Sequence, residues 1–208
     1  MKMLAGVAAL LCLSTAPARA QGSVPAAETR RYAIEVAGVR VGTMTATRTP
    51  QAGGTDVVYS LVSDVQVNFL VYRLKVYYHV VNRFRNGQLM LSTVDAHTNQ
   101  GDFASRAEWK GKHYDIVARQ YKHEYKATET QPITFAVTNL FFGGPGANAK
   151  AYAEYFGDYF TLHPGKNGVC LARRDGREDE YRYANGQLVT IIKKNPLKNF
   201  VIRWLPES

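Results

Sequence analysis

The stretch from Val57 to Phe69, VVYSLVSDVQVNF, decides the fold class of this chain. Its odd-numbered positions are nearly all apolar, whereas the other face carries Ser60, Asp64, Gln66 and Asn68. Successive side chains of a strand point to opposite faces of the sheet, so this alternation predicts a strand with one apolar face. The run is longer than most strands, and we therefore expect it to bend or to contain a bulge.

The next segment, Tyr72 to Phe84, repeats the alternation. One face is apolar, and it consists of Tyr72, Leu74, Val76, Tyr78, Val80 and Phe84. The opposite face carries Arg73, Lys75, His79 and Arg85. Two long neighbouring strands, each apolar on one face, predict a strongly curved antiparallel sheet.

Two nearly identical stretches indicate tight hairpins. RNGQL (Arg85–Leu89) returns as ANGQL (Ala184–Leu188), and an aromatic residue precedes each, Phe84 and Tyr183 respectively. Asn-Gly supplies two residues that tolerate positive φ, as a type I′ turn requires. The patterns diverge beyond each turn, so we interpret them as two hairpins of one geometry and not as a duplication.

Over the whole chain, these two strands included, the pattern predicts about a dozen strands, at the spacing expected of a barrel or sandwich. Two segments break this pattern. Gln131–Phe142 reads as a short helix with Thr130 as its cap and Pro132 in its first turn, although the same residues also alternate as a strand. Ala149–Phe156 is a second helix candidate, ended by Gly157.

These observations predict a mainly β chain. We expect a single strongly curved antiparallel meander sheet that closes into a barrel or half-barrel, with one or two short helices.

The N-terminus has the three parts of a secretory signal peptide. Lys2 precedes a short apolar run, and Ala18-Arg19-Ala20 forms an A-x-A cleavage site. The run is too short to cross a bilayer, so we expect no transmembrane segment, although an uncleaved anchor is the alternative. The prediction is a signal peptide at 1–20, a flexible lead-in at 21–30 and a single β domain at 31–208, secreted through the Sec route into the periplasm.

Sites for covalent or metal chemistry are sparse. After cleavage only Cys170 remains, which excludes an internal disulfide. Asp95-x-His97 places two polar side chains on one strand face, as a metal half-site, as an acid–base pair or as a solvent-facing pair. The acidic residues around Asp175–Glu180 alternate with arginines, which suggests a charged hairpin tip. We therefore expect no catalytic residues, no metal, no cofactor and no enzymatic activity.

The formal net charge is +9 for the whole chain, or +7 once Lys2 and Arg19 are removed. The basic residues are scattered and form none of the dense clusters typical of a nucleic-acid site. We expect a solvated basic surface and no nucleic acid partner. The oligomeric state stays open.

Aromatic residues are the remaining candidates for a function. With 13 Tyr, 9 Phe and 2 Trp, aromatic segments could close the concave face of a curved sheet around an apolar pocket. The candidate pocket residues are Phe69, Tyr78, Trp109, Phe141, Phe142 and Tyr155. The alternative is a barrel filled by its own side chains.

Several stretches carry a resemblance to a known family. They include YAIEVAGVRVGTMTATRT, FRNGQLMLSTV, QPITFAVTNLFF and AYAEYFGDYFTL. Over Tyr32 to Trp204 the chain resembles an uncharacterised family of secreted bacterial β-rich proteins, which is classed as a domain of unknown function. The resemblance implies a β fold and carries no catalytic residues.

Two functions follow as hypotheses. The first is a periplasmic, non-enzymatic β-barrel-like protein that binds an apolar or amphipathic, lipid-like ligand. The second is a cell-envelope interaction or structural protein with a filled core and a basic outer binding face. An enzyme would require Asp95, His97 or another histidine to meet a carboxylate inside a pocket.

Overall fold

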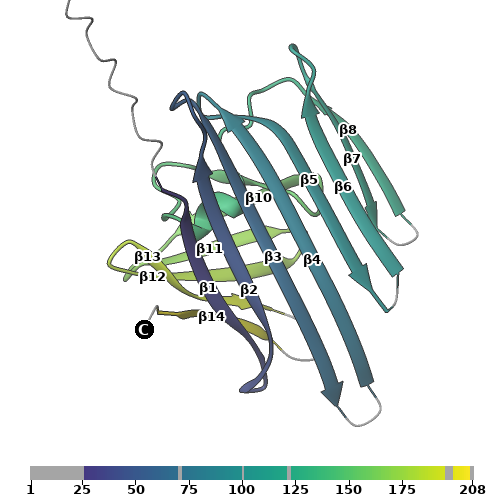
Figure 1. Cartoon of the computed structure of the whole chain (residues 1–208), viewed down its shortest axis with the longest axis vertical. Helices are drawn as coiled ribbons and strands as arrows, with labels where there is room; N and C mark the ends of the chain where they lie inside the picture. The colour runs from purple at the N-terminus through teal and green to yellow at the C-terminus, as the bar shows by residue number, and fades with distance from the viewer. Residues whose placement is uncertain (1–25, 70–71, 100, 121–122, 195–198, 207–208) are drawn as a thin grey trace, which may run out of the picture.

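The computed structural model describes residues 26–69, 72–99, 101–120, 123–194 and 199–206, drawn in colour in Figure 1. These residues form one antiparallel sheet of fourteen strands and one short 3₁₀ helix. The first eight strands are β1 (Glu28–Val36), β2 (Val39–Pro50), β3 (Asp56–Phe69), β4 (Tyr72–Arg85), β5 (Gln88–Thr98), β6 (Gly101–Trp109), β7 (Tyr114–Gln120) and β8 (His123–Glu129). Then follow the helix η1 (Val137–Phe141) and the strands β9 (Lys150–Ala153), β10 (Asp158–Pro164), β11 (Val169–Arg174), β12 (Arg177–Ala184), β13 (Gln187–Lys193) and β14 (Phe200–Leu205).

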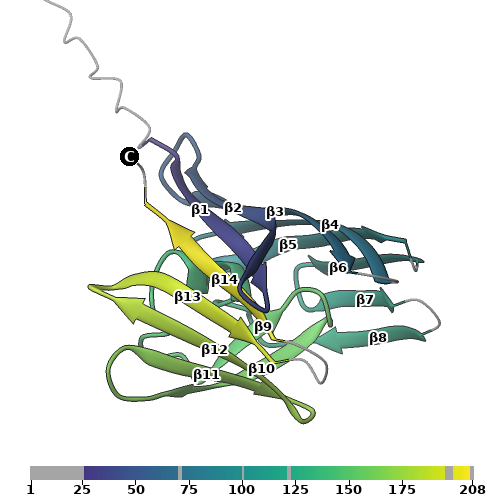
Figure 2. The same cartoon turned by 90° about the horizontal axis from the view of Figure 1, so that it is seen from below.

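The sheet is a curved meander whose two ends do not pair. Its strand order runs from β8 down to β1, continues to β14, and descends to β9. Strand β1 joins the halves, because it pairs with both β2 and β14. The chain therefore passes from one end of the sheet to the other through the segment between β8 and β9. The expected mainly β fold is confirmed in its half-barrel form, which Figure 2 shows from below.

The long strand β3 is continuous, so the bulge, one of the two alternatives expected for it, is absent. It pairs with β2 and β4 without a shift of register. The shifts lie in other strand pairs, between Ile34 and Glu35, between Arg83 and Phe84, and between Arg182 and Tyr183. Bulges increase local twist, so the neighbouring strands supply the curvature that β3 follows.

Both Asn-Gly hairpins have the expected geometry. Asn86 and Gly87 have φ values of 49° and 76°, and Asn185 and Gly186 have values of 51° and 76°. In both hairpins the aromatic residue pairs with the leucine, Phe84 with Leu89 and Tyr183 with Leu188. Both leucines are fully buried. The repeated motif therefore forms the same type of hairpin turn at two places in the sheet.

Replacing Asn86 by alanine is expected to lower the free energy of unfolding by about 1 kcal/mol, because alanine tolerates positive φ less well than asparagine. Asn185→Ala should cost a similar amount, since its φ is nearly the same. Urea titration measures both. Lys112→Ala, at an exposed turn position of ordinary φ, is the control, and a loss as large as in the two asparagine variants would contradict the explanation.

The segment Gln131–Phe142 is helical only in its last part. The helix spans Val137–Phe141, so the predicted start near Thr130 and Pro132 is wrong. Tertiary hydrogen bonds replace helical ones before it: the backbone N–H of Leu89 donates to Ile133 O, and that of Tyr152 donates to Phe135 O.

The second predicted helix, Ala149–Phe156, is also wrong. Lys150–Ala153 is strand β9, which pairs with β10, and a turn follows it. Ala151, Tyr152 and Ala153 are all buried, so both faces of the segment meet protein. An amphipathic helix would have exposed one of those faces.

The interior of the half-barrel is packed. Four tyrosines from distant strands are fully buried: Tyr32, Tyr114, Tyr152 and Tyr181. Helix η1 lies against the concave face, in contact with β3, β9 and β13. Aromatic side chains bury large areas, so this core stabilises the fold without a disulfide.

Across the described residues, no helix has the length and apolar character needed to span a membrane.

Candidate functional site

The predicted pocket residues fill space in the core. Phe141 is buried, and Tyr78, Phe142 and Tyr155 pack against the same cluster. Trp109 packs on Tyr114 with ring centroids 4.8 Å apart. The side chain of Phe69 lies outside the described residues. We compared these six residues with the linings of four surface hollows in the described chain, and they line none of the four. Their role as a ligand pocket stays a prediction.

A carboxyl group lies inside the half-barrel. Glu154, in the turn after β9, is 3% exposed. Its Oε1 accepts a hydrogen bond of 2.7 Å from Asn82 Nδ2 on β4 and one of 2.9 Å from the backbone N–H of Thr138 on η1. Asn82 Nδ2 also donates to Thr138 Oγ1 at 2.7 Å, and Ser105 Oγ donates to the carbonyl of Glu154. These contacts tie β4, β6, η1 and the β9–β10 turn together.

Burial changes the acid–base behaviour of this interior. It raises the pKa of Glu154, although the donated hydrogen bonds oppose the shift. Burial also raises the pKa of Tyr78 well above its ordinary value, and the nearby Glu154 adds to that effect. The phenol of Tyr78 therefore stays protonated at neutral pH.

The sequence holds a signal for part of this polar cluster. Asn82 interrupts the apolar face of β4, and Ser92 and Ser105 do the same on β5 and β6. Asn82 and Ser92 are direct cross-strand partners. Polar residues on an otherwise apolar strand face indicate a buried polar contact. No such sequence signal indicates that Glu154 is buried, because the expected helix would have placed its side chain in solvent.

Asp95 and His97 do not form a site together. His97 Nδ1 lies 3.0 Å from Asp102 Oδ1 across the β5–β6 pair, and its ring stacks on Tyr77 with centroids 6.2 Å apart. Both His97 and Asp102 are exposed on the outer face. Within the described ranges, no group of three or more His, Cys, Asp or Glu side chains could hold a metal ion.

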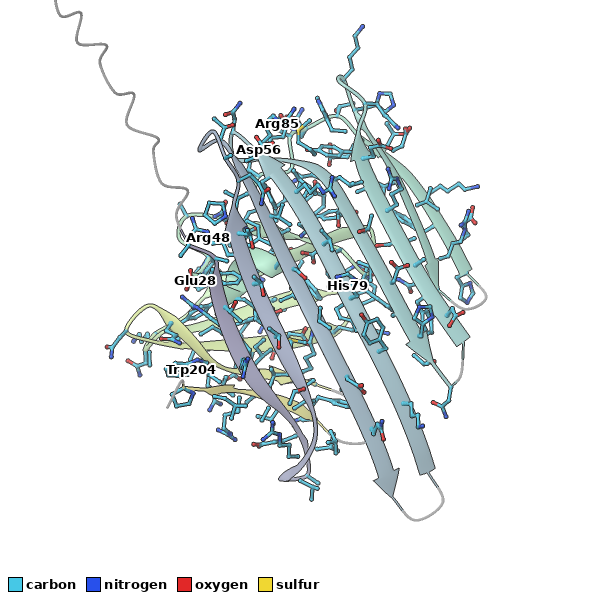
Figure 3. The ribbon with its side chains drawn as sticks, in the orientation of Figure 1. Glu28, Arg48, Asp56, His79, Arg85 and Trp204 are labelled. Carbon is cyan, nitrogen blue, oxygen red and sulfur yellow. The ribbon has the colours of Figure 1, made fainter. Side chains whose placement is uncertain are left out.

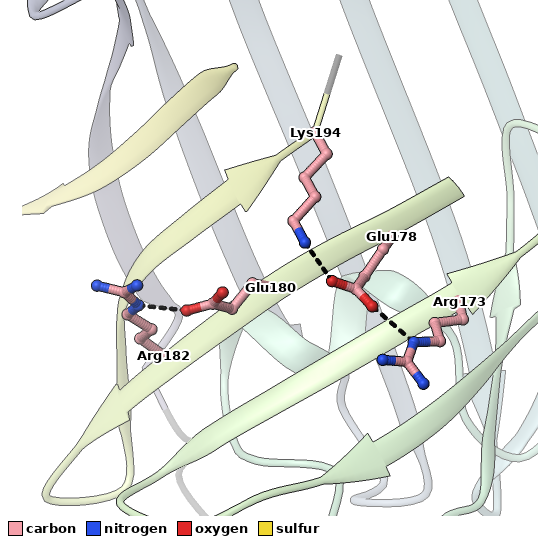
Figure 4. A network of polar contacts seen from close by, with 5 residues as sticks. All are labelled: Arg173, Glu178, Glu180, Arg182 and Lys194. Atoms are coloured by element: carbon pink, nitrogen blue, oxygen red, sulfur yellow. Dashed lines mark hydrogen bonds and ion pairs between the residues drawn. The ribbon is translucent and has the colours of Figure 1, made fainter. Parts of the chain in front are cut away.

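Ion pairs cover the outer face. Arg85 pairs with Asp56 at 3.0 Å across the β3–β4 hairpin, and Figure 3 shows the two residues side by side. The carboxylates near the β11–β12 hairpin tip also form ion pairs: Glu178 pairs with Arg173 and Lys194, and Glu180 pairs with Arg182 (Figure 4). The charged tip expected from the sequence is present, with a basic partner for each of these carboxylates.

A hollow of about 350 Å³ lies on the side where the half-barrel stays unclosed. In Figure 2 the sheet curls so that β8 faces the β10–β12 region across this side. The lining comes from β7, β8, the β9–β10 turn and the adjoining ends of β11 and β12: Ala118, Gln120, His123, Glu124, Tyr125, Phe156, Arg174 and Arg177. We call this space the seam hollow.

Tyr125 brings an accessible aromatic surface to the seam hollow. It pairs with Ala118, a buried residue of the concave face, so its ring lies on that face as well. The side chain is nevertheless 42% exposed. Opposite it, Phe156 carries Arg174 and Arg177 over its ring, at 4.6 Å and 5.3 Å from the centroid. The arrangement offers aromatic surface beside positive charge.

Comparisons with known proteins agree with this fold. A crystal structure described as a beta-barrel-like protein of domain of unknown function DUF1849, from Brucella abortus, has 8% sequence identity and a TM-score of 0.50. The similarity covers 85% of this chain and 95% of that one, and at this identity it supports the fold alone. No curated protein matches the chain in sequence.

A family model matches residues 32–204, nearly the whole described chain, and its description is a domain of unknown function. The strands, hairpins and aromatic segments that carried the resemblance all lie in this range. The chain belongs to the family described as domain of unknown function DUF6134.

Proposed function

We propose that this protein is a secreted, periplasmic binding protein without enzymatic activity, which holds an apolar or amphipathic, lipid-like ligand on the concave side of its half-barrel. The observation that carries this proposal is Tyr125, a large aromatic side chain on the concave face that is 42% exposed beside the seam hollow. Small-molecule sites are concave, partly aromatic and typically about 300–1,000 Å³, a range that the seam hollow enters at its lower end.

The packed core supports a ligand position at the unclosed side over one in the centre. Tyr32, Tyr152 and Tyr181 occupy the interior, and helix η1 packs against β3, β9 and β13. A long apolar chain would therefore lie along the β8 side, where the concave face stays accessible.

The alternative function, a cell-envelope protein that binds through a basic outer face, has less support. Outer-face arginines such as Arg106, Arg182 and Arg203 lie within ion-pair distance of carboxylates on the same or neighbouring strands. Compensated charges attract an anionic partner less strongly than isolated ones.

Native mass spectrometry of protein purified gently from an envelope extract is expected to show a bound species of lipid mass, released by organic solvent. The mature chain in the same spectrum is expected to begin at Gln21, if the signal peptide is removed after Ala20. Repeated preparations without added mass would contradict the binding proposal. A chain that keeps residues 1–20 would contradict secretion by cleavage.

A further inference from the structure

We infer that the seam hollow binds the head of an amphipathic carboxylate, such as a fatty acid, with Arg177 as its cationic contact. This inference rests on the proposed function and adds to it the charge of the ligand and the place where its head binds.

The charges around the seam hollow leave one arginine uncompensated. Arg174 lies 3.2 Å from Asp158 and 3.1 Å from Asp175, so two carboxylates already surround it. Glu124 is paired with Arg119 at 3.0 Å and with Lys126 at 2.5 Å. Arg177 forms no ion pair with a carboxylate in the described part of the chain. A single free positive charge suits a head with one negative charge.

The free guanidinium is held in place by the core. Arg177 lies over the ring of Phe156, and that ring makes edge contacts with Tyr155 at 5.0 Å and Phe160 at 6.0 Å. Stacking on an anchored ring restricts the arginine before any ligand arrives, which lowers the entropic cost of binding.

Arg177 is also reachable from two directions. It lines the seam hollow and a neighbouring hollow of about 490 Å³, which extends over Asp158, Thr161 and His163. A carboxylate at Arg177 would leave its chain free to lie against Tyr125 and Phe156, because both line the seam hollow. Arginine matches the planar geometry of a carboxylate, and the rings provide the apolar contact.

The test uses the full mature protein and cis-parinaric acid, a polyene fatty acid that fluoresces in apolar surroundings, with its methyl ester as the uncharged probe. Wild type should bind the acid more tightly than the ester. Arg177→Gln should weaken binding of the acid about tenfold, because it removes one charge-assisted contact. The affinity for the ester should stay unchanged. Tyr125→Ser should weaken both probes.

Two matched variants serve as controls. Arg83→Gln removes an exposed arginine from the outer face of β4, and Tyr77→Ser removes an outer-face tyrosine with the same 42% exposure as Tyr125. Neither should change binding, and circular dichroism confirms that all four variants fold.

The outcomes separate this inference from the proposed function. If Arg177→Gln binds the acid as tightly as wild type does, the inference is overturned and the proposed function stays in place. Equal binding of acid and ester by wild type would also overturn it. If wild type binds neither probe and carries no lipid when purified, both fail.

Discussion

Replacing Glu154 by alanine is expected to lower the free energy of unfolding by about 3 kcal/mol, because two buried donors lose their acceptor. The donors are Asn82 Nδ2 and the backbone N–H of Thr138, which both bind Glu154 Oε1. Alanine also leaves space in a packed interior, which adds to the cost. Urea titration measures the loss. A cost below about 1 kcal/mol would show that these donors find other partners.

Glu154→Gln separates hydrogen bonding from charge. Glutamine keeps an acceptor oxygen but has no proton to lose. Burial raises the pKa of Glu154 above its ordinary value of 4.5, so the folded state keeps its proton to higher pH than the unfolded state does. The stability of wild type should therefore fall as pH rises from 4.5 towards that raised pKa, whereas the variant lacks this component.

Urea titrations of wild type and Glu154→Gln at about pH 5 and about pH 8 provide the comparison. The variant should gain stability relative to wild type at the higher pH. An equal difference between the two proteins at both pH values would contradict the assignment of a buried, titrating carboxyl group.

Replacing Gly42 by alanine is expected to cost about 3 kcal/mol, because the added methyl group would meet backbone atoms and not a flexible side chain. Gly42 lies in β2 between Ile34 of β1 and Val65 of β3. A Cβ there would stand 2.9 Å from Val65 Cα and closer still to the carbonyl oxygen of Asp64. Relief requires β2 and β3 to separate, near the bulge at Ile34 and Glu35.

Gly143→Ala is the matched control, because nothing lies within 4 Å of the Cβ that it adds and its φ is not positive. It should leave the free energy of unfolding unchanged within about 0.5 kcal/mol. The soluble fraction and urea titration are measured for both variants. Equal stability of the two variants would show that β2 and β3 can move apart at Gly42 at little cost in free energy.

Much of the sheet could be predicted from residues that are neighbours in sequence. The alternation of Val57–Phe69 and the Asn-Gly pairs at Asn86 and Asn185 act over a few residues, and the structure places strands and turns there. The apolar face of β4 showed which side would be buried, although the buried Asn82 on that face was not identified. These signals are local because strand periodicity and turn geometry are local.

The errors arose where distant contacts overrode local pattern. Residues 131–136 and 150–153 have helical spacing, but their backbone groups pair with Leu89, with each other and with β10. The candidate site likewise depends on contacts between distant residues. Tyr78, Phe141 and Tyr155 were identified as aromatic residues of interest, yet they fill the core, while Tyr125 and Arg177 were not identified.

By itself the sequence determined the mainly β class, the positions of the hairpins and the apolar face of each long strand, because each depends on φ preferences and on a period of two residues. The tertiary structure alone decided that β1 pairs with β14, that Glu154 lies inside the core and that the sheet stays open between β8 and β9. These three features depend on the summed twist and curvature of fourteen strands, and the β1–β14 pair joins residues more than a hundred positions apart.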